Sequence, residues 1–383
     1  MGSYLLSHLH ALGGGVLGYL VPFLFVLSLV VFFHEFGHFL VARLCGVRIL
    51  VFSIGFGPEI VGFNDRHGTR WKVAAIPLGG YVKFFGDDNA SSVPDTPRLE
   101  AMNANERAES FFFQPVLKRA AIVVAGPMAN FVLAIAIFAT IFMLYGRPTM
   151  SARVDSVQPG SPAAAAGFQP GDVVLSIDGK AIDNFEDMQR IVSDSAGETL
   201  QIKVDRKGTP IELTATPQLK EVKDNFGNSR RIGILGITRS MGATDLKPKP
   251  MPPPQALLMG VQETWFVIDR TLNYIGGVAV GREAADQLGG PIRIAQISGE
   301  VASIGFVALI HLAAVLSVSI GLLNLFPIPL LDGGHLLFYL IEAMRGRPLS
   351  ERAQEVGFRI GLAIVVMLMI FATFNDIVHL RTS

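Results

Sequence analysis

The sequence predicts a polytopic α-helical membrane protein that also carries a membrane-associated β-structure and an inserted, outward-facing α+β domain. Half of the 383 residues are hydrophobic and only 17% are charged, against roughly 25% charged in an average soluble domain. The apolar residues fall into long blocks with ordinary polar sequence between them. These blocks predict the lipid bilayer as a partner. The net charge is zero, so we expect no nucleic acid.

Four apolar blocks are long enough to cross a bilayer core of about 30 Å, which takes about 20 residues. They lie at Gly15–Leu40, Ala120–Tyr145, Val301–Phe326 and Gly361–Phe374, and the last is short unless its N-terminal neighbours are included. No Lys or Arg precedes Arg43, and the first block has no A-x-A-like cleavage site. We therefore expect it to be a retained helix and not a signal peptide.

The basic residues predict the orientation of these four spans. Lys and Arg gather between the first and second blocks and again between the third and fourth. The positive-inside rule places both loops in the cytoplasm. The N-terminus and the segment from Arg147 to about Glu300 then face outward.

A fifth apolar stretch, Gln255–Val280, contains Glu263, Asp269 and Arg270, and its apolar residues recur at helical spacing. This pattern favours an amphipathic helix that lies in the membrane interface. A crossing at this point would reverse the direction of every later span.

The outward segment carries the signals of a small folded domain. A short strand at Val154–Val157 precedes the turn and helix of Gly160–Gly167, and a strand at Gly171–Ile177 runs into an Asp-Gly turn. Asn184 is suited to cap the next helix, and a closing hairpin follows. The order of Ser-Pro-Ala, Ala-Gly, Gly-Asp and Asp-Gly resembles a PDZ domain over Ala152–Pro217. A generic β-rich outer domain is the alternative.

These signals divide the chain into five parts. Two belong to the membrane and enclose three outward ones. The predicted parts are 1–146 with the first two spans and the β-region, 147–218 for the PDZ domain, 219–254 for a Pro-containing linker, 255–300 for the interfacial helix and a loop, and 301–383 with the last two spans.

The first apolar block contains a metal-binding pattern. The residues from His34 through Glu35 to His38 fit H-E-x-x-H. On a helix, residues i and i+4 share a face, so both imidazoles reach one Zn²⁺ while Glu35 lies beside them as a general base. Three ionisable groups in a membrane helix are costly and mark a functional interior. The structural alternative is a polar contact between helices.

A catalytic zinc site has three protein ligands and one open position. The third span runs inward and ends near Asn324, so the residues from Asp332 to His335 arrive at the depth of His34. A carboxylate and an imidazole both suit zinc. The residues alone leave the choice between Asp332 and His335 open.

The combination of H-E-x-x-H in the first span, N-x-x-P-x-P-x-x-D-G after the third and an outward PDZ domain resembles the site-2 protease family (peptidase family M50), of the bacterial RseP type. The likeness covers Phe33–His38, Gly126–Asn130, the PDZ segment and Asn324–Gly334. One departure is that the RseP type has two tandem PDZ domains, and only one is visible here, so we expect a different selection of substrates.

The resemblance implies particular roles. Asp332 becomes the third zinc ligand, and His335 supports the ligands without binding the ion. Asn324 contacts the substrate backbone, and Phe52–Phe84 folds into the membrane-associated β-structure. We expect an edge strand there, near Gly79 and Gly80, to receive an unwound substrate segment by strand addition. The prolines that break the third span are expected to help; they are Pro327 and Pro329.

The implied activity is that of a zinc metalloprotease that cleaves transmembrane segments of single-span proteins, such as anti-sigma factors or remnant signal peptides. The implied location is the bacterial inner (plasma) membrane, with the zinc site toward the cytoplasm and the PDZ domain in the periplasm. One rival is a non-proteolytic, PDZ-bearing metal-binding scaffold, which would not need Glu35. A metal transporter, the other rival, would not need a peptide-binding domain.

Two features of the second span have competing interpretations. Gly126-Pro127 is either a kink that shapes a cavity or, as we favour, a helix-packing break. Asn130 either lines the site or bonds to a neighbouring helix, and the second interpretation is preferred.

Overall fold

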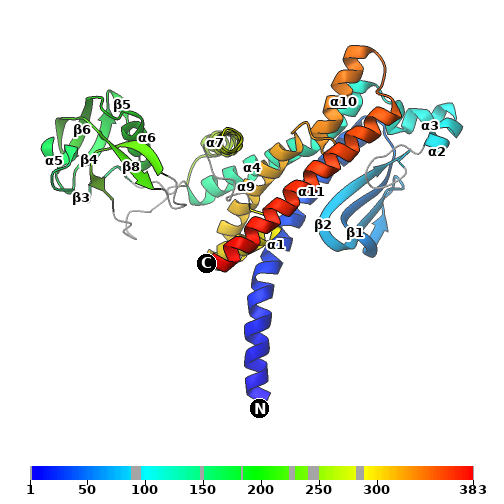
Figure 1. Cartoon of the computed structure of the whole chain (residues 1–383), viewed down its shortest axis with the longest axis horizontal. Coiled ribbons are helices and arrows are strands. Elements are labelled where there is room, and N and C mark those ends of the chain that lie inside the picture. The colour runs from blue at the N-terminus through cyan, green and yellow to red at the C-terminus, as the bar shows by residue number, and fades with distance from the viewer. Residues whose placement is uncertain are drawn as a thin grey trace. The chain divides into compact units, whose positions relative to one another are not determined.

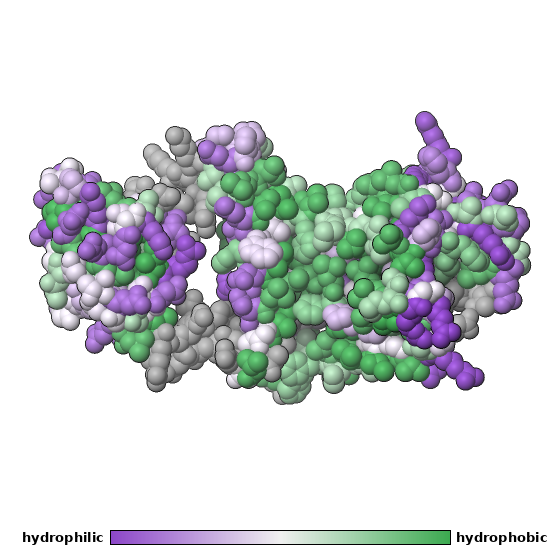
Figure 2. All heavy atoms as spheres, turned by 90° about the horizontal axis from the view of Figure 1, so that it is seen from above, coloured by the Kyte–Doolittle hydropathy of each residue, from purple (hydrophilic) through white to green (hydrophobic). Residues whose placement is uncertain are grey.

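The computed structural model describes residues 2–87, 96–146, 151–182, 184–223, 229–239, 250–281 and 289–382. The chain separates into two units, each with its own core. The first unit joins Met1–Ile141 to Pro252–Ser383, and the second is Phe142–Met251. Figure 2 shows hydrophobic side chains gathered over the helices of the first unit, whereas hydrophilic residues cover much of the second.

Four helices of the described residues are long and apolar enough to cross a membrane. They match the four predicted blocks and are α1 (Gly2–Leu44), α4 (Val116–Tyr145), α9 (Phe306–Asn324) and α11 (Glu351–Thr382). The predicted start of the third span at Val301 is wrong, because Gly305 separates α9 from a preceding helix with a φ of 147°. Only glycine adopts such a backbone freely, so the break is built into the sequence.

The predicted β-region is a hairpin that lies beside α1 (Figure 1). Strands β1 (Ile49–Asn64) and β2 (Arg70–Phe84) are antiparallel and bulged. The long strands bend, so β2 pairs twice with the first part of β1. Residues 70–73 of β2 lie on one side of it and residues 80–84 on the other. The segment 80–84 therefore forms one edge of the sheet.

Aromatic contacts fix this hairpin to the helix that carries the metal-binding pattern. The ring of Phe52 lies 4.3 Å from that of Trp71, and Trp71 lies 4.9 Å from Phe39 of α1, centroid to centroid. Phe52 is 1% exposed, so the cluster has the character of a small hydrophobic core. Short helices then lead to α4; they are α2 (Thr96–Ala101), α3 (Ala104–Glu109) and the 3₁₀ turn Phe111–Phe113.

Helix α7 (Pro253–Ala279) occupies the stretch predicted to be an amphipathic helix. Its buried positions, Ala256 and Thr264, flank Gly260, which packs against the backbone of α4. Large apolar side chains on other faces, Trp265 among them, are exposed.

The loop predicted up to residue 300 is wrong in part, because helix α8 (Pro291–Ile304) fills its second half. The carboxylate of Asp376 in α11 accepts hydrogen bonds from the N-terminal N–H groups of α8. These partners are more than 80 positions apart in the sequence, and the only local sign of the helix start is Pro291 at its first position. Helix α10 (Asp332–Arg345) follows the third span.

The second unit has the elements predicted for a PDZ domain. Strands β4 (Val173–Ile177), β5 (Lys180–Ala181), β6 (Leu200–Arg206) and β7 (Thr209–Ala215) form a sheet in the order β5-β4-β6-β7. Its two helices are α5 (Pro162–Ala165), capped by Ser161, and α6 (Phe185–Asp194), capped by Asn184 as expected.

The predicted linker at 219–254 is wrong in its first half. Strands β8 (Gln218–Lys223) and β9 (Ser229–Ile234) form a hairpin, and β10 (Ile237–Thr238) pairs with β3 (Ser156–Val157). Both strands of this hairpin are rich in charged residues, so its composition resembled a solvated charged tract. The middle of the linker, 240–249, lies outside the described residues, and the last prolines begin α7.

Candidate metal centre

The two histidines of the H-E-x-x-H pattern lie on one face of α1, one helical turn apart. Their Nε2 atoms are 3.3 Å apart, and their ring centroids are separated by 4.9 Å. Both rings therefore direct a nitrogen at the same point, as i and i+4 spacing on a continuous helix requires.

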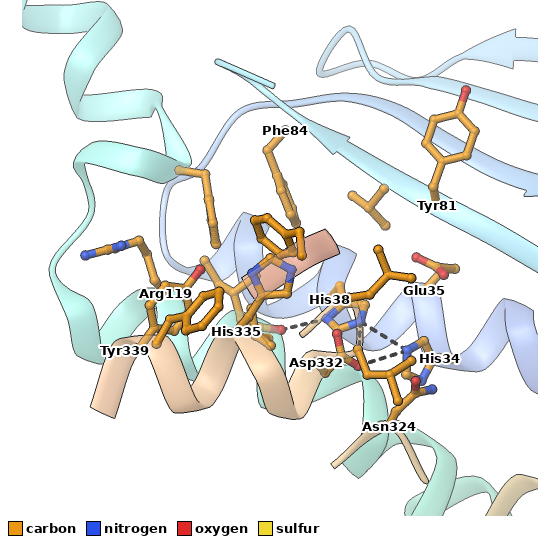
Figure 3. A pocket seen from close by; sticks show the side chains of 18 of the residues that line it. His34, Glu35, His38, Tyr81, Phe84, Arg119, Asn324, Asp332, His335 and Tyr339 are labelled. Carbon is orange, nitrogen blue, oxygen red and sulfur yellow. Dashed lines mark hydrogen bonds and ion pairs between the residues drawn. The ribbon is translucent and has the colours of Figure 1, made fainter. Parts of the chain in front are cut away.

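Asp332 completes this cluster from the first turn of α10. Its Oδ2 lies 3.1 Å from Nε2 of His34 and 3.6 Å from Nε2 of His38. The three ligand atoms all lie within 4.8 Å of one another. Figure 3 shows the three side chains pointing toward a common centre.

The loop before Asp332 is closely packed, which explains the Gly-Gly pair that follows it. A Cβ on Gly334 would lie 2.5 Å from the carbonyl oxygen of Ile328, and one on Gly333 would overlap the carbonyl of Phe326. Leu330 has a positive φ of 100°, a conformation that costs energy for a branched side chain and tends to occur at functional sites.

The donor set fits a zinc ion. Two imidazole nitrogens and one carboxylate oxygen are the ligands of many catalytic zinc sites, and they leave a fourth position free. The Oδ2 atom of Asp332 is buried, and within the described part of the chain it has no hydrogen-bond partner. A buried carboxylate oxygen without a donor is costly, and a bound cation would remove that cost.

His335, the other candidate for the third ligand, lines the same cavity but is not part of this cluster. Its ring lies 5.4 Å from that of Phe358 and 6.5 Å from that of Tyr339, centroid to centroid. The structure therefore places the carboxylate of Asp332, and not this imidazole, beside His34 and His38.

Glu35 and the metal cluster line one cavity of about 900 Å³. The predicted substrate-binding residues Asn324, Gly79 and Gly80 line it as well. A Cβ on Gly80 would lie 3.0 Å from Cγ of Glu35, so the edge segment of the hairpin passes directly over this carboxylate. Arg119 and Glu342, an ion pair at 2.6 Å that joins α4 to α10, also line the cavity.

The two prolines predicted to help bind the substrate do not line this cavity. Neither Pro327 nor Pro329 is among the described residues that line the cavity. The carbonyl group of Pro329 packs so closely against Gly361 of α11 that a Cβ there would overlap it. Their contribution to substrate binding stays a prediction, whereas the contact of Pro329 with α11 is structural.

Small residues bring α4 against the histidines. A Cβ on Gly126 would overlap Nε2 of His38 and lie 3.0 Å from Cε1 of His34, and one on Gly37 of α1 would overlap Ala125. Helix α4 continues through Pro127. The expected break at Gly126-Pro127 is therefore wrong, whereas the expected packing role holds, because Gly126 lets α4 lie against α1 and makes room for both imidazoles.

Each imidazole also contacts α4 through its other nitrogen. Nδ1 of His38 lies 2.9 Å from the carbonyl oxygen of Ile122, and Nδ1 of His34 lies 3.3 Å from Nδ2 of Asn130. Asn130 therefore bonds to a neighbouring helix, as preferred, but its partner on that helix is a residue of the metal cluster. Ile122, Gly126 and Asn130 are four residues apart and share a face of α4, a spacing that indicates the contact in retrospect.

The fold and geometry define a helical membrane protein whose first long apolar helix carries an H-E-x-x-H pattern, with Asp332 beside its two histidines. The chain belongs to peptidase family M50, which matches residues 22–368. Its relatives include "Putative zinc metalloprotease Atu1380" of Agrobacterium fabrum, 53% identical over 364 residues that cover 95% of this chain and 97% of the relative. "Metalloprotease MmpA" of Caulobacter vibrioides is 43% identical and covers 95% of this chain and 96% of its own.

A solved structure is similar to a smaller part of the chain. It is the PDZ domain of an SdrC-like protein from Listeria monocytogenes, which is 23% identical, with a TM-score of 0.18, and covers 23% of this chain and 86% of its own.

Proposed function

We propose that this chain is a zinc-dependent intramembrane endopeptidase that cleaves the transmembrane segments of single-span membrane proteins. The observation that carries the proposal is that Asp332 of α10 converges with His34 and His38 beside Glu35. These last three residues lie on α1, which is long and apolar enough to cross a bilayer. A metal site at that position with a carboxylate beside it has the parts needed for peptide hydrolysis.

His34, His38 and Asp332 would hold a Zn²⁺ ion, which would supply Lewis-acid polarisation of the scissile carbonyl and of a water molecule. Glu35 takes a proton from the attacking water and returns it to the leaving amine. The side-chain amide of Asn324 lines the same cavity and donates to the developing oxyanion.

The substrate is a helix whose peptide bonds are hydrogen-bonded, so it must unwind before hydrolysis. The edge segment 80–84 passes over Glu35, which supports the proposal that an unwound segment pairs with this strand. A side chain added at Gly79 or Gly80 would run into Phe56 or Glu35, so the test belongs on the substrate. In a synthetic single-span substrate, N-methylation of successive residues should impair cleavage with a two-residue period; a uniform loss would contradict pairing.

The location in a bacterial inner membrane, with the metal centre toward the cytoplasm and the PDZ-like domain in the periplasm, is supported by the distribution of Lys and Arg. Cys45, the one native cysteine, follows α1 and allows a direct test. An impermeant maleimide added to intact cells should label Thr209→Cys in a Cys45→Ser background and should leave native Cys45 unlabelled until the membrane is opened. The reverse pattern would contradict this orientation.

The substrates we propose are single-span proteins already trimmed on the outer side, such as anti-sigma factors or remnant signal peptides. Membrane fractions from cells with the native chain or with Glu35→Gln should be compared by proteomics. Single-span fragments are expected to accumulate only with Glu35→Gln, while that variant retains its zinc. Identical membrane proteomes would favour the alternative, a metal-binding scaffold that does not use Glu35.

A further inference from the structure

Helix α4 contacts both histidines of the metal centre through the ring nitrogen that points away from Asp332. For His38 the contact is an ordinary hydrogen bond, because the carbonyl oxygen of Ile122 can only accept and lies 2.9 Å from Nδ1. This bond places the proton of His38 on Nδ1 and leaves the lone pair of Nε2 directed toward Asp332.

The partner of His34 is the side chain of Asn130, which is fully buried. In the structure two nitrogens face each other, since Nδ2 of Asn130 lies 3.3 Å from Nδ1 of His34. At the same time Oδ1 of Asn130 is buried and, among the residues that the structure describes, has no hydrogen-bond partner. The hydroxyl of Ser317 on α9 donates to the backbone oxygen of Asn130 at 2.9 Å, which fixes this residue in place.

Binding of a metal at Nε2 of His34 decides what Asn130 must offer. A ligating imidazole carries its remaining proton on the other nitrogen, so Nδ1 becomes a donor and needs an acceptor. The amide nitrogen of Asn130 cannot accept a hydrogen bond, whereas its oxygen can. The two ends of an amide have nearly the same shape, and interchanging them places Oδ1 opposite Nδ1 and gives the buried oxygen a partner.

We infer that Asn130 is a positioning residue, whose amide oxygen accepts the Nδ1–H of His34 and holds the Nε2 lone pair of that imidazole toward the metal. The inference rests on the proposed zinc site. With it, one face of α4 supplies both imidazole acceptors, Ile122 and Asn130, on either side of the space left by Gly126. Ligating histidines commonly need such a partner, and its loss typically costs 10- to 100-fold in metal affinity or activity.

Three variants of the full-length protein in detergent test this role. Asn130→Leu has a similar size but no acceptor, whereas Asn130→Asp presents an oxygen to His34 in either orientation. Ser317→Ala is the matched control, because it removes the neighbouring hydrogen bond without touching His34. Zinc affinity is measured by competition with a chelator, and the melting temperature of the metal-free protein is measured alongside.

We expect native protein to bind one zinc ion, Asn130→Leu to bind it about 10- to 100-fold more weakly, and both Asn130→Asp and Ser317→Ala to stay within about threefold of native. A purely structural role would lower the melting temperature of Asn130→Leu and leave its zinc affinity unchanged, which would overturn the inference. Equal losses of zinc affinity in Asn130→Asp and Asn130→Leu would also overturn it. If the leucine variant does not fold, the zinc affinity of Asn130→Asp alone tests the inference. Failure of the native protein to bind zinc would instead contradict the proposed function.

Discussion

Two carboxylates of the helical unit differ in how their oxygens are used. Asp376 is 2% exposed, and its oxygens accept backbone hydrogen bonds of 2.8, 3.0 and 3.1 Å from the first turn of α8. Asp332 is also largely buried, but its Oδ2 lies beside two imidazoles and has no hydrogen-bond partner among the described residues. The hydrogen bonds of Asp376 are complete, whereas Asp332 has an oxygen available to bind a metal ion.

This difference shows that an acidic residue in a membrane helix is not by itself a sign of chemistry. Asp376 offsets the positive end of α8 and satisfies its free N–H groups, so its role is structural. An unsatisfied buried oxygen next to two good metal ligands needs another explanation. The comparison can therefore be tested by removing each carboxylate and asking which loss affects metal binding and which affects stability.

The largest effect is expected for Asp332→Ala. Loss of one of three ligands should remove most of the bound zinc and reduce cleavage by on the order of a thousandfold or more. Zinc content of the purified variant and its turnover of a single-span substrate are the measurements. Asp376→Ala is the control and should retain one zinc ion in its folded fraction; equal zinc loss in both variants would remove the distinction between them.

Gly126→Val tests whether the metal cluster depends on the space that α4 leaves. The new side chain would overlap the ring of His38, so we expect zinc affinity to fall by at least about 10-fold. Gly18→Ala in α1, where nothing lies within 4 Å of the added Cβ, is the matched control and should bind zinc like the native protein. Normal affinity in the valine variant would show that α4 does not constrain the imidazoles.

A smaller effect, on stability alone, is expected for Asp376→Ala. Three N–H groups at the start of α8 would lose their acceptor, at a cost of about 2 kcal/mol. Hydrogen exchange of the peptides from Pro291–Ile304 should become faster in the variant, while exchange around His34 stays as in the native chain. Unchanged protection of α8 would contradict the capping role.

The smallest effect concerns Asp172 of the second unit, whose hydrogen bonds are also complete. Burial raises the pKa of this carboxyl, but the hydrogen bonds from Arg206 and from the N–H of Gln169 outweigh it and hold the pKa below its usual range. A lowered pKa in the folded state stabilises the domain above about pH 4 and loses that contribution as the pH falls further.

Asp172→Asn should therefore destabilise the second unit by about 1 kcal/mol at neutral pH, and the gap to the native domain should close at low pH. Urea unfolding followed by hydrogen exchange of peptides from residues 151–238, with both proteins at the same pH, measures this difference. A gap that is independent of pH would contradict the ion pair.

The sequence predicted the metal-binding helix well because its signals are local. His34, Glu35 and His38 lie within one turn of a helix, and the long apolar runs indicate the spans directly. Asp332 is 294 positions beyond His38 in the chain. The residues alone did not distinguish it from His335 as the third zinc ligand, and only the family resemblance favoured it. Only the fold shows that His335 instead packs between Tyr339 and Phe358.

The missed elements depend on contacts between distant residues. The start of α8 is stabilised by Asp376 from α11, and β10 exists because it pairs with Ser156 and Val157 at the beginning of the same domain. Asn130 was underestimated because its partner, His34, lies on another helix. Helical periodicity indicates which residues share a face, but it does not show which neighbour that face meets.

The central claim, that His34, His38 and Asp332 hold a single zinc ion, is tested most directly by X-ray absorption at the zinc edge. Native protein should show nitrogen and oxygen ligands at about 2.0 to 2.2 Å and no sulfur. In Asp332→Cys, with Cys45 replaced by serine, one sulfur should appear at about 2.3 Å beside two imidazoles. A spectrum of Asp332→Cys that retains only nitrogen and oxygen ligands would show that residue 332 does not bind the metal.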